Sequence, residues 1–132
     1  MALISWVLFL GFSVWSTSRI LDSGAEEVRS ALREARSQTL ASVGGTSYGV
    51  HFTATGTTIF TGTTYSAAAT TNRVAGLHPR LILVASLEGG ASDVTFERQT
   101  GKSSVTGTIA VSLAADASKS RIITVLPSGL AE

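Results

Sequence analysis

Residues 1–15 read MALISWVLFLGFSVW, a stretch without a single charged side chain. The first charge is Arg19, and no proline interrupts the chain from there to about Val43. As a helix, residues 1–18 would span about 27 Å at ~1.5 Å per residue, close to the ~30 Å hydrocarbon core of a bilayer. We therefore expect a hydrophobic helix over 1–18, continued without a break by a second segment over 19–43.

Three interpretations of the apolar segment compete. A cleaved secretory signal would begin with a basic region, but nothing basic precedes this run. A plain single-pass anchor is the second interpretation, and aromatic residues at the membrane interface would fit it. The third is a helix built to pack against other apolar helices, because small residues alternate with bulky ones. The aromatic residues fall three apart, at Trp6, Phe9, Phe12 and Trp15, with Ser5, Gly11 and Ser13 among them.

The segment 19–43 has the pattern of an amphipathic helix. Its apolar stripe consists of Leu21, Ala25, Val28, Leu32, Ala35 and Thr39. A charged stripe beside it consists of Asp22, Glu26, Arg29, Arg33 and Arg36. This second stripe is either a solvated face or a surface whose acidic end meets the basic end of a neighbouring copy.

Two places in this helix are weak. Serine, threonine and glycine between Ser16 and Gly24 are poor helix formers, so local stretching or unwinding is expected there. The pair Gly44-Gly45 is expected to end the helix, because glycine is common just beyond a C-terminal cap.

The remaining residues, 44–132, predict a β-rich head domain. Alternating or apolar runs predict strands, with hairpin turns at Thr55-Gly56 and near Gly101 and a polar loop over 65–72. The predicted strands are 48–54, 57–63, 81–84, 94–96, 109–113 and 121–126. The fold class is therefore α+β, one long N-terminal helix packed against a small antiparallel sheet.

Little in the sequence points to chemistry. The chain has no cysteine and only two histidines, His51 and His78. We expect His51 to be a surface residue of its strand, and Asp93 and Glu97 to be solvated. The sequence shows no metal-ligand cluster, phosphate-binding loop or nucleophile motif. With 10 basic and 9 acidic residues it also lacks the basic surface of a nucleic-acid binder. We expect no enzyme activity, no cofactor and no metal.

In layout, the whole chain resembles the type IV pilin superfamily, and within it the H-type pseudopilins of type II secretion and related fimbrial proteins. The segment 28–37 is similar to the family's exit from its first helix, and 48–52 with 59–65 to its first hairpin. Residues 107–109, 120–125 and 128–130 look like its closing strands.

This resemblance implies a structural filament subunit, or a minor tip subunit of a type II secretion pseudopilus. Such subunits carry a basic leader that a prepilin peptidase removes, so Met1 would be the mature, N-methylated residue. The subunit would wait in the bacterial inner membrane, and assembly machinery would then move it into a helical homo-oligomer at the cell surface. The filament core would be packed by Leu3, Ile4, Trp6, Val7, Leu8, Phe9, Leu10, Gly11, Phe12, Val14 and Trp15.

The sequence departs from the family at position 5. The family's usual glutamate there is thought to pair with the N-terminal amine of an adjacent subunit, and this chain has Ser5. A buried amine without a carboxylate is costly, which leaves major, minor and tip positions open. A membrane-tethered adhesive or scaffold domain that never polymerises is the alternative function.

Overall fold

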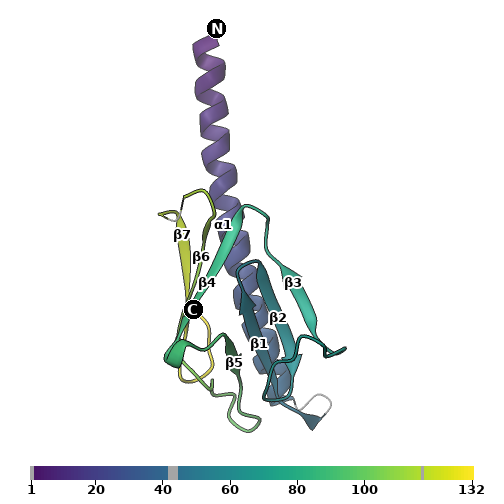
Figure 1. The fold of residues 1–132 in the computed structure, drawn as a ribbon. Coiled ribbons are helices and arrows are strands. Elements are labelled where there is room, and N and C mark those ends of the chain that lie inside the picture. The colour runs from purple at the N-terminus through teal and green to yellow at the C-terminus, as the bar shows by residue number, and fades with distance from the viewer. Residues whose placement is uncertain (1, 42–44, 117) are drawn as a thin grey trace.

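A computed structural model describes residues 2–41, 45–116 and 118–132. Its dominant element is α1, a helix of 39 residues over Ala2–Leu40. The first half of α1 extends beyond the β-rich head, and the second half lies along the head (Figure 1). This arrangement confirms the expected fold class, one long N-terminal helix packed against antiparallel strands.

The apolar stripe predicted on α1 forms the centre of the core. All six of its members are buried, and Val28, Ala35 and Thr39 have no exposed surface. Its five apolar members face buried side chains from both sheets described below, in one continuous hydrophobic cluster. Burial of this stripe, rather than intrinsic propensity, holds the second half of α1 in place.

The expected unwinding between Ser16 and Gly24 is wrong for this structure, where α1 continues through it. Gly24 explains why. It is buried, and a Cβ added there would lie 2.5 Å from Leu81 Cδ1 and 3.2 Å from Val111 Cγ1. The glycine therefore allows a strand to approach the helix closely, and the packing outweighs its cost of ~1 kcal/mol in a helix.

The first sheet has four antiparallel strands in the order β3-β2-β1-β5. Their bounds are β1 Tyr48–Thr53, β2 Gly56–Thr61, β3 Arg73–Gly76 and β5 Asp93–Thr95. Strands β1 and β2 form a hairpin whose turn residues are Ala54 and Thr55, one position earlier than expected. Strand β3 is missing from the sequence prediction because all four of its residues are exposed and show no alternation.

The second sheet has three antiparallel strands in the order β4-β6-β7. They are β4 Leu81–Leu87, β6 Gly107–Leu113 and β7 Ser120–Val125, and the short 3-10 helix η2, Glu88–Gly90, follows β4. The face of this sheet toward α1 is built from Leu81, Leu83, Leu87, Ile109, Val111, Leu113, Ile123 and Val125, all buried.

The prediction of one sheet is thus corrected to two; in the view of Figure 1, β1 and β2 overlie the second half of α1, and β6 and β7 lie to its left. The two sheets meet where β4 passes the β1–β2 turn, because Leu83 N donates to Ala54 O at 3.0 Å. The backbone also joins them just before β4, where Leu77 N donates to Thr55 O at 2.8 Å.

Thr39 joins the end of α1 to the start of the first sheet. Its buried hydroxyl donates to Ala35 O at 2.8 Å and accepts from Tyr48 N, also at 2.8 Å. The helix ends at Leu40, three residues before the expected Val43. Residues 42–44 lie outside the described part, so the proposed stop at Gly44-Gly45 is described only from Gly45 onward, where φ is 70°.

The core position of the stripe leads to a stability prediction. Leu32→Ala should lower the free energy of unfolding by about 2–5 kcal/mol, because the leucine is 1 % exposed and its removal leaves a cavity. Ser30→Ala on the exposed side of the same turn is the control and should change it by less than about 0.5 kcal/mol. Urea denaturation followed by circular dichroism measures both. Equal effects would contradict the helix orientation described here.

Candidate functional site

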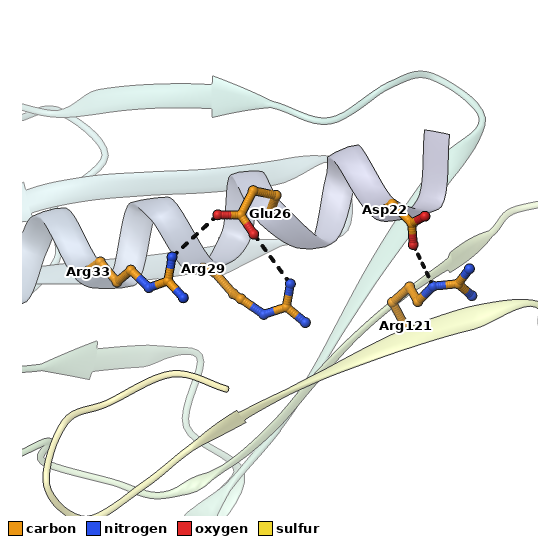
Figure 2. A network of polar contacts seen from close by, with 5 residues as sticks. All are labelled: Asp22, Glu26, Arg29, Arg33 and Arg121. Carbon is orange, nitrogen blue, oxygen red and sulfur yellow. Dashed lines mark hydrogen bonds and ion pairs between the residues drawn. The ribbon is translucent and has the colours of Figure 1, made fainter. Parts of the chain in front are cut away.

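The charged stripe of α1 forms an exposed surface beside the second sheet, hereafter the charged face: Asp22, Glu26, Arg29, Arg33 and Arg36. Glu26 lies at its centre. Its carboxylate accepts from Arg29 Nη1 at 3.4 Å and from Arg33 Nη1 at 3.3 Å, one and two turns along the helix (Figure 2). The predicted neighbour pair Glu26–Arg29 is confirmed, and Glu26 also binds the arginine seven residues on.

The two ends of the charged face contact the head. Arg121 of β7 donates from Nε to Asp22 at 2.8 Å (Figure 2). The same guanidinium donates from Nη2 to Ser18 Oγ at 3.4 Å. At the other end, Arg36 donates from Nε to the carbonyl of Gly101 at 3.1 Å. The charged face therefore also helps to position the head against α1, a role that the sequence pattern did not indicate.

The ion pairs on this face are weak because they are exposed. The side chains of Glu26 and Arg33 are 58 % and 59 % exposed. Exposed pairs of this kind contribute about 0–1 kcal/mol each. The same charges can thus exchange their partners for those of another molecule at little cost.

A groove lies between the end of α1 and the C-terminal residues, hereafter the basic groove. Its volume is about 630 Å³, and its lining includes Arg33, Arg36, Leu40, Leu130 and Glu132. Leu40 and Leu130 are 40 % and 49 % exposed, which places two large apolar side chains in one polar-rimmed hollow.

A second groove lies on the other side of α1, against the first sheet, hereafter the acidic groove. Its volume is about 410 Å³, and Glu26, Glu27, Glu34, Ile59 and Ala75 are among its lining residues. The carboxylate of Glu34 accepts from Arg73 of β3 at 2.8 Å and from Gln38 at 3.1 Å. The two sides of α1 therefore differ in charge.

The predicted sites of the apolar N-terminal segment, residues 1–15, are placed only in part. Met1 lies outside the described residues. Ser5 and the eleven expected core-packing positions all fall on α1, and the structure describes their helical backbone alone. Their roles in packing and in meeting the amine of Met1 stay predictions.

His51 corrects one expectation. Its side chain is 20 % exposed rather than fully on the surface, and its Nδ1 pairs with Asp93 Oδ1. Its ring stacks on Tyr65, with ring centroids 3.7 Å apart and planes 3° from parallel. Asp93 is opposite His51 in the β1–β5 register, which a sequence without strand pairing cannot reveal.

Histidine–carboxylate pairs occur in nucleophilic active sites. Such a site needs a serine, threonine or cysteine within hydrogen-bond reach of the histidine. In the described parts of the chain no serine or threonine hydroxyl is hydrogen-bonded to His51, and the sequence has no cysteine. The same parts contain no group of three or more His, Asp or Glu arranged to hold a metal ion.

Two exposed carboxylates have lowered pKa values. The hydroxyl of Thr106 and then its backbone N–H, at 2.8 Å, bind Glu88 and hold its pKa below the ordinary value of 4.5. The hydroxyl of Ser118 at 2.6 Å and its N–H at 3.1 Å do the same for Asp116, whose ordinary pKa is 3.8. Both carboxylates thus stay ionised to a lower pH than an ordinary Glu or Asp side chain.

The fold itself is recognisable among solved structures. Two crystal structures of the type IV minor pilin FimU from Pseudomonas aeruginosa strain PAO1 superpose with TM-scores of 0.65 and 0.65, at 19 % and 18 % identity. They cover 85 % and 89 % of this chain, and 90 % of the FimU chain in each case. The chain has a type IV pilin-like fold. No protein-family model and no curated protein sequence matches it.

In this pilin-like fold, α1 is the long N-terminal helix and the two sheets form the head. The resemblance drawn from short sequence runs is therefore confirmed at the level of fold. Within residues 2–41, 45–116 and 118–132, no helix combines the length and the apolarity of a membrane span.

The weakness of the exposed ion pairs is testable. Arg33→Gln should change the free energy of unfolding by less than about 1 kcal/mol, since Arg33 and Glu26 are both more than half exposed. Urea denaturation of the full chain measures this, with Leu32→Ala as the destabilised reference. A loss above about 2 kcal/mol would show that the charged face is mainly a stabilising network.

The Glu88 turn gives a pH prediction. Because the folded pKa is lowered, its stabilisation is present above pH 4.5 and is lost as the pH falls through the folded pKa. Thr106→Val should raise the pKa of Glu88 toward its ordinary value. It should also make the free energy of unfolding less dependent on pH in the acidic range. NMR titration of the Glu88 side chain measures the shift. Thr108→Val, on β6 and not bonded to Glu88, should leave that pKa unchanged.

Proposed function

We propose that the chain is a structural subunit of a type IV pilus-like or pseudopilus filament. The observation that carries this proposal is the division of α1: one uninterrupted helix whose second half is buried in a pilin-like head and whose first half extends beyond it (Figure 1). The first half is also the uncharged, apolar end of the sequence. A helix of this kind requires an apolar environment that its own head does not supply.

Other copies of the chain would supply that environment. Apolar helices with small residues among bulky ones pack closely against one another. Before assembly the same segment would stand in the bacterial inner membrane, after a prepilin peptidase has removed a leader and left Met1 as the methylated N-terminus. Assembly machinery would then move the subunit into a helical homo-oligomer at the cell surface.

The charged face is the second element of the proposal. Its acidic residues, Asp22 and Glu26, precede its basic residues, Arg29, Arg33 and Arg36, along the helix. A copy displaced along the filament would therefore place acidic groups near basic ones. The internal pairs are exposed and weak, so they do not prevent this exchange.

Ser5 favours a second candidate, a minor or tip subunit. Without a carboxylate at position 5, the chain cannot neutralise the amine of an adjacent subunit by an ion pair. At the tip of a filament no subunit lies ahead, and this requirement disappears. The fold is also that of a protein described as a minor pilin, and a type II secretion pseudopilus would offer such a position.

Electron microscopy of cells that make the full chain tests the proposal. Phe9→Lys should abolish incorporation into filaments, because a charge in an apolar helix bundle is costly, whereas Phe9→Leu should retain it. Immunogold labelling along the filament indicates a major subunit, and labelling at one end a tip subunit. A chain that stays in the membrane as a monomer under assembly conditions would support the non-polymerising adhesive or scaffold domain instead.

A further inference from the structure

Each sheet of the head has one open strand edge. The outer edge of β4 is joined to the β1–β2 turn, because Leu83 N donates to Ala54 O at 3.0 Å. The outer edge of β5 is joined to the chain that follows it, because Ser104 N donates to Thr95 O at 2.8 Å. In the described parts of the chain this leaves β3 open in the first sheet and β7 open in the second. In Figure 1 they lie at the right and the left of the head.

On β7 the open backbone groups belong to Ile122. Two residues further on, Thr124 N donates to Glu132 O at 2.8 Å and Glu132 N donates to Thr124 O at 3.0 Å, on the side away from β6. Backbone direction alternates along a strand, so the N–H and C=O of Ile122 also point away from β6. No hydrogen bond from the described residues occupies this pair of groups. The Ile122 side chain is 52 % exposed.

On β3 the corresponding groups belong to Val74. Leu77 N, just beyond the strand, donates toward β2, to Thr55 O at 2.8 Å. By the same alternation, the N–H and C=O of Val74 and Gly76 point away from β2, to the open side. The Val74 side chain is 78 % exposed. Each open edge therefore presents unpaired backbone groups beside an exposed β-branched side chain.

Neither edge has the features that usually prevent strands from pairing, such as outward-facing charges, proline or bulges. The only charged residues of the two strands are Arg73 and Arg121. Both point toward α1, where they bind Glu34 and Asp22 at 2.8 Å. Since these charges are paired within the chain, they do not repel an incoming strand.

The two open strands run in opposite directions along α1. Strand β3 begins beside Glu34, and Leu77 just beyond its end lies near Gly24, so it runs toward the N-terminus of α1. Strand β7 begins beside Asp22 and ends at the basic groove, so it runs the other way. In two copies whose α1 helices are parallel, β7 of one copy and β3 of the other are therefore antiparallel.

We propose that the open edge of β7 in one subunit pairs with the open edge of β3 in a second copy. Ile122 and Val74 would stand directly opposite each other, exchange both N–H···O=C bonds and bring their side chains into contact. The contact joins two different edges, so it propagates into an open chain of subunits rather than closing as a dimer. The inference rests on the proposed function, because it assigns the contact between heads within the filament.

This pairing also sets an axial step between the two copies. Glu34 and Asp22 mark where β3 and β7 begin, and the twelve residues between these positions correspond to about 18 Å of helix. Val74 and Ile122 each lie one residue further along, toward each other's level, at ~3.3 Å per residue. Paired copies would therefore be displaced by about 11 Å along α1.

Cysteine cross-linking tests the contact directly, since the chain has no cysteine of its own. Val74→Cys combined with Ile122→Cys in the full chain should give, after mild oxidation of intact filaments, a ladder of dimers, trimers and higher oligomers. The Cα atoms of such a strand pair are about 5.5 Å apart, within reach of a disulfide. Filaments mixed from the two single variants should give dimers only. The control pair combines Val74→Cys with Val84→Cys, which is 53 % exposed but lies on β4, and should not cross-link.

Charge substitution tests the same contact without cross-linking. Val74→Lys with Ile122→Lys should reduce filament mass roughly fivefold, because like charges directly opposite each other destabilise a strand pair. Val74→Glu with Ile122→Lys introduces as many charges but should keep most of the filament mass. Val84→Lys should leave it unchanged. Both edge side chains are exposed, so each head should remain folded, which circular dichroism checks.

The outcomes separate this inference from the proposed function. Filaments that form normally but yield no ladder from the Val74–Ile122 cysteine pair overturn the edge contact and leave the filament role intact. A dimer from Ile122→Cys alone would show that two β7 edges pair with each other, and would likewise overturn it. A ladder from membranes that make no filaments would support the edge contact and overturn the proposed function. The absence of both filaments and ladder would overturn both.

Discussion

The fold depends on the apolar stripe of α1. Val28, Leu32 and Ala35 are almost completely buried, and both sheets pack on them within one cluster. Neither sheet has another layer of secondary structure against its inner face in the described parts of the chain, so the helix is the common centre of the head. The same helix then continues past the head as its apolar first half, and one element thereby serves both the folding and the proposed assembly of the subunit.

The polar surface around this stripe is organised differently. Its ion pairs connect α1 to β7 through Arg121 and to β3 through Arg73, but all are exposed and contribute little stability. Such charges are better suited to giving specificity to a contact with another copy than to stabilising the head. Burial therefore determines the fold, and charge placement on the two sides of α1 would determine how copies align.

Sequence patterns predicted those features that depend on local periodicity. The buried stripe, the long helix and most strands were predictable because alternation and helical spacing report burial directly. Strand β3 was not, because its residues are all exposed. The division into two sheets and the His51–Asp93 pair depend on which strands lie side by side, which no local pattern records. The effect of Gly24 was predicted wrongly for the same reason. The absence of its side chain makes room for Leu81, a residue distant in the sequence.

The absence of a break in α1 also fixes how the head is rotated relative to the apolar half of the helix. Since Ala2–Leu40 is one helix, the direction in which the head faces is locked to that of the apolar half. One residue inserted between them would turn the head by about 100° and shift it by about 1.5 Å, whereas seven residues would leave a turn of only about 20°. Under the proposed assembly, the length of this helix is therefore constrained to steps of nearly whole turns, because other lengths would rotate the head away from its neighbours.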